Sequence, residues 1–307
     1  MPPADAAQPL FVGVDVGGTK IEALAIDAAS GEELARRRVP SPSHGYRDML
    51  QAIGAVVASV EAGFGPAPHV GIGAPGSRSP ATGLQRNANS TVLNGRPFAD
   101  DLAAVLRRPI RLANDADCFA LAEARQGAGA GERCVFGVIL GTGVGGGLVL
   151  DGDLRTGRNA IAGEWGHLEL PGRDLAEPLP DIACWCGRRR CVEAFCSGPA
   201  LAADHARVAG ESGLDAAAIA ARATTGEAGA RATLERHADR LASALSVVVD
   251  VVDPDVVVLG GGLSNLAGLA ERVQALLPSR VFSDVCTTAV VRHRLGDAAG
   301  ARGAAWL

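Results

Sequence analysis

A glycine-rich turn between two apolar strands occurs twice in this 307-residue chain, and this repeat constrains the fold most. The first copy runs from Leu10 to Ile26 and turns at Gly17-Gly18-Thr19. The second runs from Val135 to Leu150 and turns at the glycine-rich segment 141–147. Glycine gives the backbone the freedom that a tight reversal needs, and β-branched residues flank the turns. One such unit near the start of each half of the chain predicts a duplicated architecture.

Helical and strand patterns alternate along the rest of the chain, which predicts an α/β class with mixed sheets. We expect helices over residues 46–60, 98–106, 117–125, 238–252, 266–277 and 300–307, and short strands over residues 70–74, 110–113 and 255–259. The length suggests about two domains of about 150 residues each. No low-complexity linker separates them, and we place the boundary between residues 125 and 126.

Composition argues against several classes of protein. The net charge is −5, from 34 acidic and 29 basic residues, and no basic stripe is present, so nucleic acid is not an expected partner. No run of about 20 apolar residues occurs, so we expect no membrane span. The segment Met1 to Leu10 lacks the positive start and apolar core of a signal peptide. We therefore expect a soluble, cytoplasmic protein.

The first glycine turn, Asp15-Val-Gly-Gly-Thr-Lys20, has the residue types of a phosphate-binding loop. Gly17 and Gly18 allow backbone N–H groups to approach phosphate oxygens, and the Thr19 hydroxyl can donate a hydrogen bond. Asp15, at the end of a buried strand, could hold a metal ion through water. On these residues alone, an ordinary hairpin turn explains the pattern equally well. The spacing of a Walker A loop is absent.

The second turn, Gly141-Thr-Gly-Val-Gly-Gly146, matches the Gly-x-Gly-x-x-Gly pattern of dinucleotide-binding proteins. Such a fold needs a helix directly after the glycines and an acidic residue further on. Here the strand-like residues 147–150 follow instead. The segment therefore indicates a second phosphate-facing hairpin, and a dehydrogenase is disfavoured.

The pair Asn114-Asp115 follows a predicted short strand and precedes a predicted helix. Asp115 could act as a general base that accepts the proton of a substrate hydroxyl. A helix N-cap is the alternative, because Asp is among the preferred N-cap residues.

Three cysteines, Cys184, Cys186 and Cys191, lie within eight residues of the chain, and in a reducing compartment this favours a metal over a disulfide. Three thiolates and one imidazole make a closed tetrahedral zinc site. The nearest histidine upstream is His167, in the segment Gly163-Glu-Trp-Gly-His167. The other cysteines lie in apolar surroundings and are expected in the core: Cys118, Cys134, Cys196 and Cys286.

Together these motifs resemble the ROK family of sugar kinases, and the resemblance runs nearly from end to end of the chain. Its further carriers are Gly71-Ile-Gly-Ala-Pro-Gly76, Asn87-Ala-Asn-Ser90, Cys184-Trp-Cys-Gly187, Cys191-Val-Glu193, Gly260-Gly-Gly262 and Gly303-Ala-Ala-Trp306. The resemblance implies an α/β, two-lobed actin/hexokinase-like (ribonuclease H-like) fold with a ligand cleft between the lobes. It implies an N-terminal lobe of residues 1–125, completed by a helix at about 297–307, and a C-terminal lobe of residues 126–296 with a zinc-binding loop.

The resemblance also implies an ATP:hexose 6-phosphotransferase with Asp115 as the catalytic base. The residues then expected to bind ATP and Mg²⁺ are Asp15, Gly17, Gly18, Thr19, Lys20, Gly141, Thr142, Gly143, Gly145, Gly146, Gly261 and Gly262. Those expected to bind the sugar are Gly76, Asn89, Asn114, Asp115, Glu164, His167 and Glu193. A structural Zn²⁺ that shapes the sugar loop would be bound by His167, Cys184, Cys186 and Cys191. A small-molecule sugar is the expected partner, and a homodimer is the expected assembly.

Arg190 departs from the family pattern, because glycine usually precedes the third cysteine. If this position needs a positive φ, arginine is strained there by about 1 kcal/mol or more. The family also contains transcription regulators, which carry a helix-turn-helix segment before the kinase-like part. Asp15 lies too close to Met1 to leave room for such a segment, so we expect an enzyme and not a regulator. Asp115 and the two turns argue against a sugar-binding protein without catalysis.

Different parts of the chain resemble branches of the family that act on different sugars. The loop Arg86–Phe98 resembles the fructokinase/mannokinase branch of the family, whereas residues 114–123, 139–150 and 260–265 resemble the N-acetylglucosamine kinase branch. We give the loop most weight, because it should line the sugar pocket and its Asn87, Asn89 and Ser90 suit hydroxyls better than an N-acetyl group. Fructose or mannose is therefore expected ahead of N-acetylglucosamine, and glucose is a further alternative.

Overall fold

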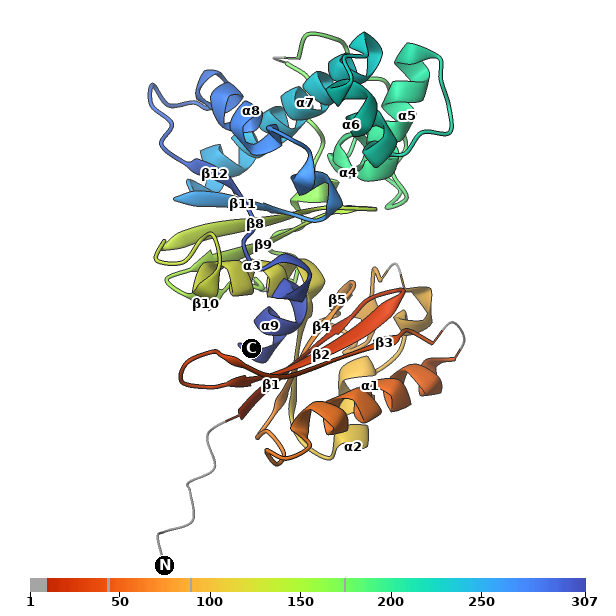
Figure 1. Ribbon diagram of the computed structural model, residues 1–307, viewed down its shortest axis with the longest axis vertical. Helices are drawn as coiled ribbons and strands as arrows, with labels where there is room; N and C mark the ends of the chain where they lie inside the picture. Colours follow the sequence, from red (N-terminus) through yellow and green to blue (C-terminus); the bar gives the residue numbers. More distant parts are fainter. Residues whose placement is uncertain (1–9, 43–44, 89, 174) are drawn as a thin grey trace, which may run out of the picture. The chain divides into compact units, whose positions relative to one another are not determined.

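The computed structural model describes residues 10–42, 45–88, 90–173 and 175–307, which form two compact units. The first contains the described residues up to Glu123 together with Leu154–Ala162 and Leu295–Leu307, and the second contains Ala124–Asp153 and Gly163–Arg294. A five-stranded mixed sheet lies at the centre of each unit (Figure 1). Across the described ranges, no helix has both the length and the apolar character needed to cross a membrane.

The sheet of the first unit has the strand order β3-β2-β1-β4-β7. Its strands are β1 (Leu10–Val16), β2 (Lys20–Asp27), β3 (Glu33–Pro40), β4 (Val70–Ala74) and β7 (Ile110–Asn114), and a small ribbon of β5 (Ser77–Arg78) and β6 (Gln85–Arg86) lies beyond β4 in the chain. β1, β2 and β3 are antiparallel neighbours, whereas β1, β4 and β7 run parallel. The reversal between β1 and β2 falls at residues 17–19, as the first glycine turn predicts.

Helices pack on both faces of this sheet, because successive strand residues point to opposite sides. They are α1 (Tyr46–Glu61), α2 (Phe98–Leu106), α9 (Ala299–Ala305) and the start of α3 (Asp115–Gln126). Ala25 of β2 lies in the core that includes α1 and α2, and its neighbour Leu24 packs against α9 on the other face (Figure 1). A Cβ at Gly71 in β4 would lie 1.7 Å from the Ala304 carbonyl oxygen, so only glycine allows α9 to approach this closely.

The sheet of the second unit repeats the plan of the first. Its order is β10-β9-β8-β11-β12, with β8 (Cys134–Leu140), β9 (Val144–Leu150), β10 (Asp153–Leu154), β11 (Val256–Gly260) and β12 (Ala289–Arg292). β8 and β9 form an antiparallel hairpin, and β8, β11 and β12 run parallel. Both units therefore share the topology that the duplicated turn predicts, and the α/β class is confirmed.

The long helix α7 (Ala228–Val252) supplies much of the core of the second unit, where Leu241 and Leu245 pack with Val257 of β11. The other helices of this unit are α4 (Glu193–Cys196), α5 (Gly198–Ala209), α6 (Ala216–Thr224) and α8 (Leu269–Leu276). Short 3₁₀ turns occur at η1 (Thr91–Leu93), η2 (Trp165–His167), η3 (Gly262–Asn265), η4 (Leu277–Ser279) and η5 (Gly296–Ala298). α7 begins at Ala228 and not at residue 238, because its polar first turns bury Ala230, Thr233 and His237.

Candidate functional site

The carboxyl ends of the three parallel strands in the first unit meet at one edge of its sheet. Asp15 of β1 stands opposite Gly73 of β4, and Ala74 of β4 stands opposite Asn114 of β7. Neighbouring strands lie about 4.8 Å apart, so this register brings Asp15 to the same edge as Asn114-Asp115. Open α/β sheets bind their ligands at such an edge.

Asn114 is the last residue of β7 and directly precedes helix α3. Asp115 is the first residue of the helix, and the Asn114 Oδ1 atom accepts a 2.8 Å hydrogen bond from the Ala116 N–H. The Asn114 Nδ2 group donates to the Gly76 carbonyl at 3.0 Å. Gly76 has a φ of 76°, and a Cβ there would lie 2.2 Å from the Arg86 carbonyl oxygen. The Asp115 Oδ1 atom accepts from the same Ala116 N–H at 2.9 Å, so both side chains cap this N–H group at the start of α3.

Asp15 and Asp115 form a carboxylate pair whose surroundings oppose full ionisation. The pKa of Asp15 is raised to about 7, first by burial and then by the negative charge of Asp115, while the charge of Lys20 opposes both effects. Burial also raises the pKa of Asp115. A Cβ at Gly300, in the first turn of α9, would lie 2.9 Å from the Asp15 carboxyl carbon, so backbone closes that side. Carboxylate oxygens of this kind are the ligands that Mg²⁺ prefers.

Two hydrogen bonds hold the backbone of the first glycine turn, and the tip of the turn is exposed to solvent. Gly17 N–H donates to the Lys20 carbonyl at 2.9 Å, and the Ser41 hydroxyl donates to the Gly17 carbonyl at 2.6 Å. Gly18 and Thr19 are exposed to solvent. The turn thus presents a glycine backbone and a hydroxyl group to a ligand without needing to rearrange.

The second glycine turn is held by segments that follow it in the second unit. Gly198 N–H donates to the Gly141 carbonyl at 2.8 Å, and Val144 N–H donates to the Glu193 Oε2 atom at 2.9 Å. A Cβ at Gly143 would lie 2.6 Å from the same carboxylate oxygen. Glycine at this position therefore makes room for the Glu193 side chain.

The flanks of the second turn are also packed too tightly for side chains. The Trp165 Nε1 group donates to the Gly145 carbonyl at 2.9 Å, and a Cβ at Gly146 would lie 2.6 Å from the Trp165 ring. Gly261, with a φ of 77°, would place a Cβ 2.4 Å from the Leu140 carbonyl oxygen. The exposed glycine-rich backbone at the ends of β8 and β11 includes Thr142 and Gly262.

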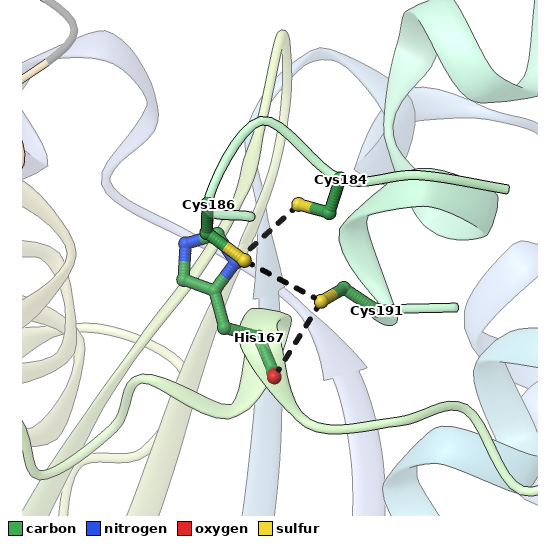
Figure 2. Close-up of side chains that lie close together, drawn as sticks. All are labelled: His167, Cys184, Cys186 and Cys191. Atoms are coloured by element: carbon green, nitrogen blue, oxygen red, sulfur yellow. Dashed lines mark hydrogen bonds between the residues drawn. The ribbon is translucent and has the colours of Figure 1, made fainter. Parts of the chain in front are cut away.

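His167, Cys184, Cys186 and Cys191 come together at one point in the second unit (Figure 2). One ligand atom from each of the four residues lies within 4.8 Å of all the others. The His167 Nδ1 atom is 3.8 Å from the Cys184 sulfur, and the Cys186 and Cys191 sulfurs are 3.7 Å apart. Two sulfurs bound about 2.3 Å from one tetrahedral zinc ion are about 3.8 Å apart. The spacing and the chemistry of these four donors therefore fit zinc.

The cysteine loop is connected to the second glycine turn through Glu193, the first residue of α4. The Glu193 carboxylate accepts hydrogen bonds from Val144 N–H and from the Trp185 indole N–H. The Trp185 ring also contacts the His167 ring edge-on, with ring centroids 5.2 Å apart. Glu164 lies immediately before η2, which ends at His167. The Cys-Trp-Cys-Gly motif does not by itself indicate a role for Trp185, because only the folded loop places its indole against Glu193.

Arg190 adopts a φ of 55°, so the position before the third cysteine does require the left-handed conformation. The Arg190 guanidinium forms an ion pair with Glu169, which partly compensates for the strain. Asn89, a predicted sugar ligand, lies outside the described residues.

Comparison with known proteins identifies the class of protein to which this fold and these residues belong. A ROK hexokinase from Thermus thermophilus aligns with a TM-score of 0.85 and 31% identity over 96% of each chain. A ROK glucokinase from Streptomyces griseus, solved with glucose and AMPPNP, aligns with a TM-score of 0.76 and 29% identity over 96% of this chain and 98% of that one. The two-lobed actin/hexokinase-like fold is thereby confirmed.

The sequence model of the ROK family matches residues 11–307, and the chain belongs to this family. It is 40% identical over 302 residues to an N-acetyl-D-glucosamine kinase from Shigella boydii, which covers 97% of this chain and 99% of the relative. An N-acetyl-D-glucosamine kinase from Escherichia coli is equally similar. These relatives favour the sugar that the sequence analysis ranked second.

Proposed function

We propose that this chain is a sugar kinase that transfers the terminal phosphoryl group of ATP to the 6-hydroxyl of N-acetyl-D-glucosamine. Family membership and the relatives named for this activity support the proposal. The observation that carries the chemistry is the buried carboxylate of Asp115, at the end of β7 and beside the carboxylate of Asp15. Phosphoryl transfer needs positioning and charge neutralisation, and a carboxylate to orient the attacking hydroxyl.

In this proposal Asp115 accepts the proton of the sugar hydroxyl as the hydroxyl attacks phosphorus. Asn114, held between the Gly76 carbonyl and the Ala116 N–H, fixes the start of α3 and so the direction of the Asp115 side chain. Because burial raises the pKa of Asp115, turnover should fall on acidification as this carboxylate takes up a proton. Asp15 would hold Mg²⁺ through water, and the ion would neutralise the phosphates.

The remaining predicted residues fall into two groups. We propose that the exposed backbone and hydroxyl groups of Gly17, Gly18, Thr19, Gly141, Thr142, Gly143, Gly145 and Gly146 contact phosphate oxygens, with Lys20, Gly261 and Gly262 as further contacts to the nucleotide. We propose that Glu164, His167 and Glu193 bind sugar hydroxyls. The expected homodimer and cytoplasmic location stay predictions.

Zinc is proposed as a structural ion bound by His167 Nδ1 and the three cysteine sulfurs. With four protein ligands the site would be closed, so the ion would supply rigidity and no open position for a substrate. The Nε2 atom of His167 would then remain available for a sugar hydroxyl. The ion would also order the turn that carries Trp185 and, through it, Glu193.

The Asn87–Asn94 loop is a weak indicator of fructose or mannose, because two of its asparagines serve the backbone of the loop. Asn94 accepts from the Ala88 N–H and donates to the Ala88 carbonyl, each at 2.9 Å, so it clamps the loop itself. Asn87 has a φ of 59°, a conformation that asparagine tolerates better than most residues. Both asparagines thus have backbone roles that do not depend on the sugar.

A coupled ADP-release assay with N-acetylglucosamine, glucose, mannose and fructose tests the proposal. We expect kcat/KM to be at least about tenfold higher for N-acetylglucosamine than for the other three sugars. A site that hydrogen-bonds a polar group of its substrate discriminates strongly against a sugar without that group. Phosphorus NMR of the product should show a 6-phosphate. A tenfold preference for fructose or mannose would contradict the choice of sugar, and ADP release that is independent of every sugar would contradict the kinase assignment.

A further inference from the structure

A second group of metal-ligating side chains lies in the second unit and shares no residue with the cysteine cluster. It consists of His205 on α5, Glu211 in the loop after α5, and Glu227 immediately before α7. One ring nitrogen and one oxygen from each carboxylate all lie within 4.8 Å of one another. Three separate segments of the chain therefore direct potential ligands to one place.

The hydrogen bonds of His205 determine which of its nitrogens carries a lone pair. The Thr233 hydroxyl donates its only proton to the Gly229 carbonyl at 2.9 Å. Its oxygen must therefore accept the 2.9 Å hydrogen bond that joins it to the His205 Nδ1 atom. With the proton on Nδ1, the neutral ring has an unprotonated Nε2. A hydrogen bond that fixes the tautomer in this way is typical of histidines that bind metals through the other nitrogen.

The Nε2 atom of His205 is buried and has no hydrogen-bond partner among the described residues. The whole side chain is 0% exposed. Buried polar atoms are nearly always paired, so an unpaired acceptor on a ring that has one nitrogen within 4.8 Å of an oxygen from each carboxylate requires an explanation. A cation that binds the lone pair and both carboxylates would satisfy all three groups.

Arg222 now neutralises the two carboxylates from the solvent side. Its guanidinium lies 2.6 Å from Glu211 and 3.6 Å from Glu227, and its side chain is 37% exposed. The hydrogen bond from Arg222 is the largest effect that lowers the pKa of Glu211, so this carboxylate is ionised at neutral pH. Exposed ion pairs contribute little stability, so a divalent ion can displace the arginine.

We propose that His205, Glu211 and Glu227 bind a divalent transition-metal ion such as Zn²⁺. An imidazole nitrogen with two carboxylates suits zinc and its neighbours better than Mg²⁺ or Ca²⁺, which prefer oxygen ligands alone. The ion joins the end of α5, the loop before α6 and the start of α7. It therefore acts as a clamp on the helical part of the second unit and takes no part in phosphoryl transfer.

Zinc counting after equilibrium dialysis tests the proposal, with Zn²⁺ alone as the probe. Wild-type protein is compared with the double variant Glu211→Gln and Glu227→Gln, whose substitutions are partly exposed and keep the side-chain shapes. We expect the wild type to bind one more zinc equivalent than the double variant, and zinc to raise the Tm more in the wild type. The kinase activity of the double variant should equal that of the wild type.

Two further variants separate this site from the cysteine cluster. Cys184→Ser protein should still bind the zinc equivalent that the double variant loses. Arg222→Gln should tighten binding at the new site by about fivefold, because removing one competing cation is worth about 1 kcal/mol at a surface. Co²⁺ bound at this site should show no thiolate charge-transfer absorption. Equal zinc content in wild-type and double-variant protein would overturn the proposal, whatever the cysteine cluster binds.

Discussion

Replacing His237 by leucine should make the second unit less sensitive to acid. His237 lies on α7 with 2% of its side chain exposed, and neither ring nitrogen has a hydrogen-bond partner among the described residues. The pKa of His237 is lowered to about 4, first by burial and then by the charges of Arg240 and Arg272, while Asp204 opposes them. The folded protein therefore keeps this ring neutral where an exposed histidine would be charged.

The sign and size of the effect follow from the two pKa values of His237. In the unfolded chain the pKa is about 6.5, so below that pH the unfolded state takes up a proton that the folded state refuses. The free energy of unfolding is thus unaffected above about pH 7 and falls as the pH drops toward 4. The full loss is about 3 kcal/mol, and about 2 kcal/mol is already lost at pH 5.

Urea denaturation of wild-type and His237→Leu protein at pH 7.5 and pH 5 measures this effect. The fluorescence of buried Trp165 reports on the second unit. The stability difference between the variant and the wild type should shift in favour of the variant by about 2 kcal/mol between the two pH values. His69→Leu, at a partly exposed site in the first unit, is the matched control and should change this difference much less. Parallel stability curves for wild type and His237→Leu would refute the reasoning.

Three further predictions test the candidate site. Asp115→Asn should lower kcat by about 10²–10⁴-fold with an unchanged fold, because it removes the base and keeps the shape; near-normal turnover in steady-state kinetics would leave Asp115 with a structural role only. Cys184→Ser should lower the zinc content at the cysteine cluster, the stability and the sugar affinity together, whereas Cys286→Ser should change none of them; a stable, metal-free variant with full sugar affinity would argue against the zinc site. Arg190→Gly should be about 1 kcal/mol more stable than Arg190→Ala in thermal denaturation, because both lose the ion pair with Glu169 but only alanine keeps the strain at positive φ. Equal stabilities of these two variants would show that the loop relaxes around alanine.

Local patterns in the sequence were enough to predict the duplicated plan and many of the elements, but not β3, β12, α5 or α6. The glycine-rich segments 17–19 and 141–147 predict reversals because glycine removes a steric restriction that acts within a few residues. The second reversal occupies only residues 141–143, because β9 already begins at Val144. The spacing of Cys184, Cys186 and Cys191 predicts that the three sulfurs can meet, because a short loop limits how far apart they can be. The position of Arg190 before the third cysteine pointed to backbone strain, and its φ of 55° agrees.

The sequence could not show which asparagines of the Asn87–Asn94 loop serve the backbone. The high asparagine content favoured a polar sugar pocket, and hence fructose or mannose. Only the folded loop shows that Asn94 bonds to Ala88 and that Asn87 occupies a left-handed conformation. Side-chain partners depend on the path of the backbone, which a residue type alone does not specify.

By itself, the sequence determined the two glycine-turn hairpins, strands such as β4 and β7, helices such as α1 and α2, and the motifs that place the chain in the ROK family. The tertiary structure alone decided which distant residues share an environment. The register of β1, β4 and β7 places Asp15 near Asp115, and α9 brings Gly300 against the Asp15 carboxylate. The packing of α5 against α7 joins His205 Nδ1 to Thr233 and brings the His205 ring to the carboxylates of Glu211 and Glu227. Burial and charge act through space, so the pKa of Asp15 and the unpaired nitrogen of His205 are properties of the folded chain.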